Sequence, residues 1–222
     1  ERPMGLDDLL QRNRTWAAYM VAQDPEYFSR HAGGQKPRIL WIGCADSRVP
    51  GEQVLSSRPG ELFVHRNIAN IVSYNDVNLA AVVQYAVEHL KVQDIVVCGH
   101  YGCGGVRAAC QDKVVGGYIG DWLMIAGWAK RWVEERLRKE GKERPSDEEF
   151  LDLVVEENVR LQVKHLSALS MIREAWDHQP GVPRLHGWCY DIRSGHIKVV
   201  HKGIDGQGSI DGQGAAKLAG EA

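Results

Sequence analysis

Long apolar runs and an excess of positive charge are both missing from this sequence. No stretch approaches the roughly 18 apolar residues that cross a bilayer, so we expect no membrane-spanning segment. The 222 residues include 27 Lys and Arg against 29 Asp and Glu, which gives a formal charge of −2. Nucleic-acid binders usually carry a basic excess or a basic stripe, so we expect no nucleic-acid partner either.

Cysteine is scarce, and the five thiols are an odd number in a chain too long to need disulfide staples. Such thiols are typical of a reducing compartment. The first residues show no cationic segment followed by an apolar stretch, which favours a cytoplasmic protein over a secreted one. The chain begins at Glu1 rather than Met, and this leaves open a targeting segment that has been removed.

The rest of the composition is that of an ordinary globular protein, with 44% hydrophobic and 25% charged residues. We predict a single zinc-binding domain over residues 1–203, opened by a helical arm at about residues 6–30 that breaks near Pro25. Residues 204–222 are interpreted as a Gly-rich, flexible tail, in which Ile-Asp-Gly-Gln-Gly occurs at 204–208 and again at 210–214. Two copies are too few for a calcium-binding β-helix.

Short apolar runs alternate with helical patterns in the first half of the chain. The runs predict buried strands at residues 38–43, 62–65 and 94–99, and Asn75 or Asp76 caps a helix between the second and the third. This alternation predicts an α/β fold with a mainly parallel central sheet, covered by helices on both faces.

The second half of the chain predicts helices followed by a hairpin. An apolar stripe predicts a helix over 121–139, and Ser146 with Glu149 forms a capping box that opens a long helix to about residue 176. Residues 184–190 and 196–202 predict two strands joined at Ser194-Gly195, which form an antiparallel edge hairpin.

Metal-binding side chains follow two of the predicted strands. Cys44 comes directly after the first strand, and His100 and Cys103 come directly after the third. In open α/β sheets, ligands bind in the crevice outside the carboxyl ends of the strands. Two Cys and one His suit a tetrahedral zinc with one position left over. Each residue alone is more often part of a core, but their shared placement favours an open metal site with a catalytic role.

Asp46 and Arg48 strengthen this interpretation. The simplest alternative is a surface salt bridge, which contributes little. Beside a metal, a bidentate Arg48 would hold the Asp46 carboxylate in a fixed orientation. The carboxylate would then accept a hydrogen bond from zinc-bound hydroxide, or become a fourth zinc ligand that closes the site. Two thiolates neutralise Zn²⁺, so an anion beside the metal needs its charge offset, and Arg48 supplies that.

Other candidate residues are interpreted as structural. The glycine-rich segment 99–105 lacks the Lys-Ser/Thr ending of a phosphate-binding loop. Core positions are the better interpretation of the other three thiols, and helix packing is the better interpretation of three tryptophans at roughly helical spacing. These residues are Cys98, Cys110, Cys189, Trp122, Trp128 and Trp132.

At the metal-binding residues the sequence resembles the β-class carbonic anhydrases. The resemblance extends from about residue 8 to about residue 203, and the Gly-Gln tail lies outside it. Two short segments, Gln35-Lys36-Pro37 and His186-Gly187-Trp188, add to three longer motifs. These are Cys44-Ala45-Asp46-Ser47-Arg48, Gly60-Glu61-Leu62-Phe63-Val64-His65-Arg66-Asn67-Ile68-Ala69-Asn70 and Gly99-His100-Tyr101-Gly102-Cys103-Gly104-Gly105.

The resemblance implies reversible hydration of carbon dioxide to bicarbonate and a proton. It implies one Zn²⁺ per chain, held by Cys44, His100 and Cys103, with Asp46 and Arg48 as the catalytic pair. By the same likeness, Gln35 would be a substrate-side amide and Gly104 would offer a backbone N–H to the substrate. Family members build the active site at a tight dimer interface and often pair dimers into tetramers, so a second copy of the chain is an expected partner.

One subset of the family closes its site at low pH and binds bicarbonate in a second, non-catalytic pocket. The residues that match its markers are Trp41, Arg66 and Tyr190, whose side chains are three donors suited to one small oxyanion. Each also has a structural alternative, as strand packing, an ion pair or a sheet residue. We therefore expect activity to fall below neutral pH and bicarbonate to inhibit there.

Two alternatives to carbon dioxide hydration stay open at this point. The first is hydrolysis of carbonyl sulfide or carbon disulfide on the same scaffold, because the attack by zinc-bound hydroxide is shared. The second is a zinc-binding regulatory protein without turnover. Asp46 and Arg48 argue against the second, since a purely structural zinc site is normally closed by four ligands.

Overall fold

The computed structural model describes residues 5–111, 116–204 and 206, and contacts within the chain divide it into two units that meet between Lys36 and Pro37. The first unit contains helices α1 (Leu6–Gln23) and α2 (Tyr27–Ala32), so the predicted break near Pro25 is confirmed. Trp16 packs edge-on against Phe28, with 5.6 Å between the ring centroids. No residue of α1 is buried, so its apolar side chains stay partly or largely exposed in this unit.

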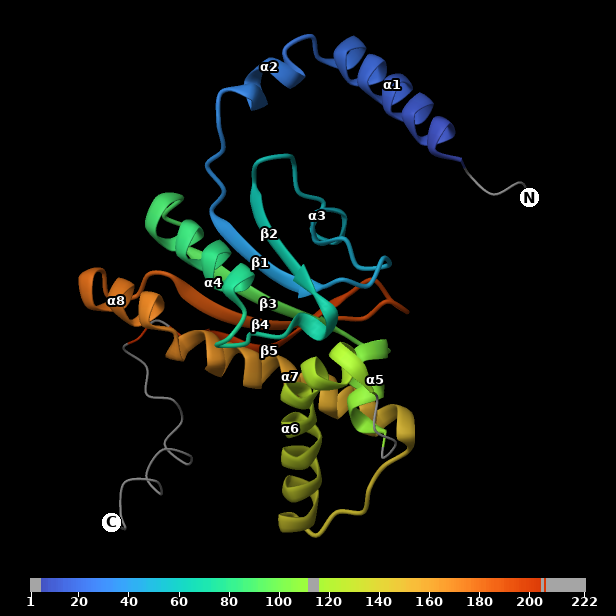
Figure 1. The fold of residues 1–222 in the computed structure, drawn as a ribbon, viewed down its shortest axis with the longest axis vertical. Coiled ribbons are helices and arrows are strands. Elements are labelled where there is room, and N and C mark those ends of the chain that lie inside the picture. Colours follow the sequence, from blue (N-terminus) through green and yellow to red (C-terminus); the bar gives the residue numbers. More distant parts are fainter. Residues whose placement is uncertain (1–4, 112–115, 205, 207–222) are drawn as a thin grey trace. The chain divides into compact units, whose positions relative to one another are not determined.

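The second unit is built on a five-stranded sheet of order β2-β1-β3-β4-β5 (Figure 1). The first four strands in this order are parallel, and β5 pairs antiparallel with β4. The predicted α/β class and the antiparallel edge hairpin are therefore confirmed. The strands are β1 (Ile39–Cys44), β2 (Leu62–Asn67), β3 (Asp94–His100), β4 (Arg184–Tyr190) and β5 (Ile197–Ile204).

Helices join most of the strands, and α5, α6 and α7 form the lower part of the view in Figure 1. Asp76 caps α4 as predicted, with its carboxylate accepting from the amides of Asn78 and Leu79. The capping box of Ser146 and Glu149 is present at the start of α7. The helical elements of this unit are α3 (Gly51–Val54), the 3₁₀ turn η1 (Ile68–Asn70), α4 (Val77–Gln84), its π-helical continuation η2 (Tyr85–His89), α5 (Gly104–Cys110), α6 (Gly117–Lys139), α7 (Asp147–Ala168) and α8 (Ser170–His178).

The prediction of one continuous helix from residue 146 to about 176 is wrong, because the helix is interrupted at Leu169. Leu169 adopts extended backbone angles, φ −64° and ψ 136°, and separates α7 from α8. No Gly or Pro marks this break in the sequence. Leu169 and Ile172 are both buried, so packing on the two sides of the break outweighs the local preference for continuous helix.

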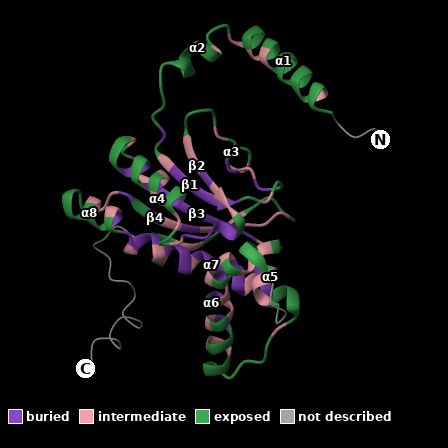
Figure 2. Cartoon of the chain, in the orientation of Figure 1, coloured by how far each residue is buried: buried purple, intermediate pink, exposed green. Residues whose placement is uncertain are grey.

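The two faces of the sheet are covered unequally. The main core joins one face, which includes Leu40, Ile42 and Val97, to the buried sides of α4, α6, α7 and α8. Figure 2 shows this burial concentrated in the strands and in α7. The opposite face carries a much smaller cluster around Trp41, Val96 and Cys98, packed by partly buried residues such as Trp188. The predicted helical cover of both faces is therefore uneven in this unit.

Two further predictions, on the tryptophans of α6 and on the start of the tail, differ in part from the structure. Trp122 packs against the main core, but Trp128 is 53% exposed, because it lies on the side of α6 away from the buried Ala126 and Ala129. β5 reaches Ile204, the first residue of the predicted tail. The rest of that tail, apart from Gly206, lies outside the described residues, and so does the repeated Gly-Gln segment beyond it.

Candidate metal centre

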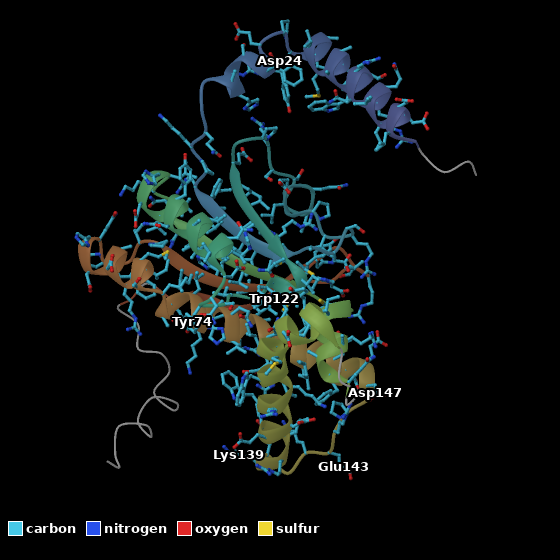
Figure 3. All side chains as sticks on the ribbon, viewed as in Figure 1. Asp24, Tyr74, Trp122, Lys139, Glu143 and Asp147 are labelled. Atoms are coloured by element: carbon cyan, nitrogen blue, oxygen red, sulfur yellow. The ribbon has the colours of Figure 1, made fainter. Side chains whose placement is uncertain are left out.

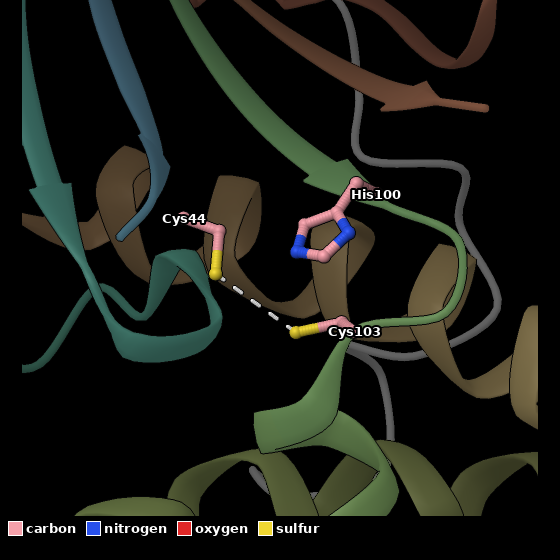
Figure 4. Close-up of side chains that lie close together, drawn as sticks. All are labelled: Cys44, His100 and Cys103. Carbon is pink, nitrogen blue, oxygen red and sulfur yellow. Dashed lines mark hydrogen bonds between the residues drawn. The ribbon is translucent and has the colours of Figure 1, made fainter. Parts of the chain in front are cut away.

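Three metal-binding side chains converge at the carboxyl edge of the sheet. β1 and β3 are neighbouring parallel strands. Cys44 and His100 are the last residues of these strands, whereas the sequence predicted that they directly follow them. Cys103 is the N-cap of α5. The ligand atoms of the three lie within 4.8 Å of one another, and Figure 4 shows their side chains turned toward a common point. We call Cys44, His100 and Cys103 the metal triad.

The hydrogen bonding and burial of the imidazole suit a metal ligand. His100 is fully buried, and its Nδ1 lies 3.1 Å from the carbonyl oxygen of Tyr101. If Nδ1–H donates to that carbonyl, Nε2 carries the lone pair. Nε2 is buried and has no hydrogen-bond partner among the described residues. A buried polar atom without a partner is costly, and a metal ion bound there would remove that cost.

The two thiols form a coupled pair, with 3.9 Å between the sulfur atoms. The hydrogen bond from Cys103 lowers the pKa of the Cys44 thiol, and the backbone amides of Asp46 and Ala69 lower it further. The pKa of the Cys103 thiol is raised by the same hydrogen bond and by burial. A divalent cation bound between the two sulfur atoms would favour two thiolates. Two thiolates and one imidazole are a donor set that fits zinc.

Asp46 and Arg48 form a bidentate ion pair beside the triad. Arg48 Nε and Nη2 donate to the two carboxylate oxygens at 2.9 and 2.7 Å, and the backbone amide of Arg48 donates to Oδ1 at 3.0 Å. These bonds hold the pKa of the Asp46 carboxyl far below its usual range. Asp46 Oδ2 lies 3.8 Å from His100 Nε2, so an ionised carboxylate faces the triad from the side of the loop.

A small cavity of about 260 Å³ opens over the triad. Its lining includes Cys44, Asp46, Cys103, Gly104 and the apolar side chain of Ile68. Gly104 lies at the start of α5 and in the wall of the cavity, and its expected role of offering a backbone N–H to the substrate stays a prediction. Gln35 belongs to the N-terminal unit and is exposed there, and its expected role as a substrate-side amide stays a prediction.

The three residues expected to bind bicarbonate lie on the less covered face of the sheet. The Trp41 indole N–H is buried and has no partner among the described residues, and Tyr190 packs against the cluster around Trp41. Arg66 pairs in register with Gly43, two residues along β1 from Trp41, and so shares its face. The Arg66 guanidinium donates to the carbonyls of Cys44 at 2.8 Å and of Asp46 at 2.5 Å. It therefore braces the loop that carries the ion pair.

Sequence reasoning missed two supports of the triad. The Tyr101 hydroxyl donates to Glu156 at 2.8 Å, and the Arg193 guanidinium lies over the Tyr101 ring. Glu156, buried on α7, also pairs with Lys198 at 2.7 Å. These contacts anchor the loop between His100 and Cys103. The second support lies at the turn after β2. The indole N–H of Trp122, which is labelled in Figure 3, donates to the carbonyl of Ile68 in this turn at 2.8 Å. No residue spacing in the sequence indicates either.

Comparison with known proteins gives consistent matches over most of the chain. Residues 39–197 match the family model described as carbonic anhydrase. A carbonic anhydrase of Emericella nidulans is 38% identical over 198 residues, which cover 88% of this chain and 83% of the relative. One from Pseudomonas aeruginosa is 38% identical and covers 79% and 78%.

Solved structures of similar fold carry related names. A β-carbonic anhydrase of Sordaria macrospora, described as tetrameric, superposes with a TM-score of 0.81 at 42% identity and covers 88% of this chain and 96% of that one. A Coccomyxa β-carbonic anhydrase in complex with acetazolamide gives a TM-score of 0.83 at 37% identity, with coverage of 90% and 88%.

Proposed function

Because this chain belongs to the β-class carbonic anhydrases, zinc enzymes that interconvert carbon dioxide and bicarbonate, we propose that the metal triad holds one zinc ion and that Asp46 and Arg48 form the catalytic pair. The observation that carries the proposal is the convergence of two thiols and an unpartnered buried imidazole nitrogen beside an ionised carboxylate. No feature of the described residues favours a closed, purely structural site, since the triad supplies three ligands and opens on a cavity.

The bound zinc would supply a Lewis acid that generates a hydroxide nucleophile from water near neutral pH. The chain's own residues then position the reactants. Asp46, held by Arg48, accepts a hydrogen bond from the attacking oxygen and orients it toward the substrate. Ile68 gives the cavity an apolar wall suited to carbon dioxide. Gly104 lines the same cavity, and its backbone N–H would stabilise the oxygen charge that develops on the substrate.

The test is a stopped-flow assay of carbon dioxide hydration on zinc-loaded protein, with carbonyl sulfide as a parallel substrate. We expect rapid hydration and little hydrolysis of carbonyl sulfide. Zinc-loaded protein that leaves both substrates unchanged would contradict the proposal, and a preference for carbonyl sulfide would move the function to the hydrolase alternative.

Self-association fits the exposed apolar surface. Trp128, Met124, Val77 and Tyr118 are all exposed, and they line a groove that shares Ile68 with the metal cavity. Exposed patches of this kind mark protein interfaces. We therefore propose that a second copy covers this groove, giving a dimer or a tetramer like that described for the Sordaria relative.

We also propose that bicarbonate regulates the enzyme through Trp41, Arg66 and Tyr190. The support is the buried, unpartnered indole N–H of Trp41 and the hydrogen bonds by which Arg66 holds the carbonyls of Cys44 and Asp46. An anion that draws Arg66 toward Trp41 would loosen the loop and favour a state in which Asp46 leaves Arg48 and takes the fourth zinc position. Such an effect requires bicarbonate to bind that state more tightly.

We propose a cytoplasmic location from the thiol content, since the five cysteines are all free in the structure. Among the described residues, no helix combines the length and the apolar character needed to cross a membrane.

A further inference from the structure

The segment from Asn67 to Val72, which we call the wall turn, borders the metal cavity and has an unfavourable backbone. It leads from the end of β2 toward α4, and Ile68 lines the cavity beside Cys44 and Cys103. Ala69 and Asn70 both have positive φ, 63° and 49°. Residues other than Gly avoid this left-handed region, so two in succession persist only where the surroundings hold them.

Two buried amides on α7 supply that hold. Asn158 is 1% exposed and Gln162 is fully buried, and they lie one helical turn apart on α7, whose other buried side chains are mostly Val and Leu. Asn158 Nδ2 donates to the carbonyl of Ala69 at 3.0 Å, and the backbone amide of Val72 donates to Gln162 Oε1 at 2.8 Å. Gln162 Nε2 donates to Asn158 Oδ1 at 2.8 Å, which ties the two amides together. Buried amides are costly unless they are bonded, and the bonds of this pair lead to the wall turn.

The Asn67 side chain bonds further backbone groups of the wall turn. Asn67 Nδ2 donates to the carbonyl of Ile71 at 2.8 Å, and the Ile71 amide donates back to Asn67 Oδ1 at 2.8 Å. Asn67 is itself paired in register with Cys44, and its carbonyl accepts from the Ala45 amide at 2.8 Å. A movement of the wall turn is therefore transmitted directly to the strand end that carries the Cys44 thiol.

The wall turn also packs tightly against the start of α5, which follows Cys103. A Cβ built on Gly105 would lie 2.9 Å from Ile68 Cγ2 and 3.2 Å from the Ala69 Cβ. The turn thus touches the surroundings of both thiols, Cys44 through β1 and Cys103 through α5. Its conformation sets the wall of the cavity and the backbone groups around the sulfur atoms.

We propose that Asn158 and Gln162 are positioning residues of the metal centre, which hold the wall turn against Cys44 and Cys103 and thereby fix the surroundings of the bound zinc. This inference rests on the proposed function, because it assumes that the triad binds zinc. Groups that orient metal ligands from outside the ligand set typically change metal affinity 10- to 100-fold when they are removed.

The test compares Asn158→Leu and Gln162→Met, which keep the side-chain volumes close to the native ones, with Val163→Ala as the control. Val163 is buried on the same helix but faces Gly187 on β4, away from the wall turn. Zinc affinity is measured by competition with a chromophoric chelator. Co²⁺ is then loaded in place of zinc, and the thiolate-to-cobalt absorption bands report the geometry around the sulfur atoms without any turnover.

We expect Asn158→Leu and Gln162→Met each to weaken zinc binding about 10-fold or more and to shift the cobalt bands. Because the two amides act as one unit, the double variant should lose no more than about the larger single loss. Val163→Ala should lower the melting temperature while zinc affinity and the cobalt spectrum stay native. If Asn158→Leu does not fold, Gln162→Met and the conservative Gln162→Glu, which keeps an acceptor for Val72, carry the test.

Native zinc affinity and native cobalt bands in the folded Asn158 and Gln162 variants, with only a lower melting temperature, would overturn the inference and leave a structural role. Failure of the proposed function has a different signature: wild-type protein would then bind no zinc through the triad, or would bind it and not hydrate carbon dioxide.

Discussion

The contact between the wall turn and α5 can be tested with one methyl group. Gly105 and Gly104 are adjacent residues at the start of α5, and both line the metal cavity. A Cβ on Gly105 would meet Ile68 Cγ2 at 2.9 Å, Ala69 Cβ at 3.2 Å and Leu123 Cδ2 at 3.5 Å. A Cβ on Gly104 would meet nothing within 4 Å. Gly104→Ala is therefore a matched control for Gly105→Ala.

The expected size of the effect follows from what can move. The Ile68 methyl lies on a β-branched side chain with a stiff χ1, and the Ala69 Cβ is fixed to a left-handed backbone, so neither yields cheaply. Inserting a methyl group into such a contact typically costs about 1–3 kcal/mol. Replacing Gly by Ala in a helix returns about 0.5–1 kcal/mol, so the net destabilisation should be roughly 1–2 kcal/mol.

Thermal unfolding in excess zinc at matched protein concentration measures this cost. For a chain of this size, about 1 kcal/mol lowers the melting temperature by roughly 2–4 °C, so Gly105→Ala should melt about 2–8 °C below wild type. Gly104→Ala, which has the same helix gain and no clash, should melt about 1–4 °C above wild type. Because Gly105→Ala displaces the wall turn, and Ile68 of this turn lines the metal cavity, its kcat/KM should fall further than its stability alone explains. Equal stability of the two variants would refute the packing argument.

Three further predictions concern the metal and the catalytic pair. Cys103→Ala should lose most of its zinc and its activity, because two ligands hold zinc poorly; full zinc content by elemental analysis would remove Cys103 from the triad. Asp46→Asn should keep its zinc but lose roughly 10²–10⁴-fold in kcat, because the amide cannot accept in the same way and misplaces Arg48; near-native turnover with zinc bound would make the pair structural. Arg48 lowers the pKa of the Asp46 carboxyl in the folded protein. The ion pair is therefore intact above the ordinary carboxyl pKa, and it is lost only as pH falls through the lowered pKa. A fall in activity between pH 8 and pH 6 therefore cannot come from protonation of Asp46. We expect bicarbonate to steepen this fall in wild type, and we expect the fall to be flatter in Trp41→Phe. A shallow pH profile that bicarbonate does not change in either protein would exclude the regulatory pocket.

Ligand chemistry and the positions of the strands were accessible from the sequence. Cys44, His100 and Cys103 are recognisable by residue type, and the apolar runs before them predict buried strands. Parallel strands place their carboxyl ends at one edge, so the three residues had to converge. Strand and helix boundaries were accurate to a few residues, because Asp76 and the box of Ser146 with Glu149 mark helix starts by local hydrogen bonds.

Other features depended on partners far away in the chain. The break at Leu169 carries no Gly or Pro, and the exposure of Trp128 follows from which side of α6 finds the core. The unequal cover of the two sheet faces likewise follows from where the helices pack, and an apolar strand looks the same in sequence whichever face is covered.

The sequence by itself determined which atoms can bind the metal and which edge of the sheet presents them, because both follow from residue type and local pattern. Only the tertiary structure decided how that site is held. The left-handed turn at Ala69 and Asn70 is unfavourable locally, and its support comes from Asn158 and Gln162, about ninety residues away on α7. A hydrogen bond between groups so distant leaves no periodicity in the chain, since it exists only once the core has brought α7 against the sheet.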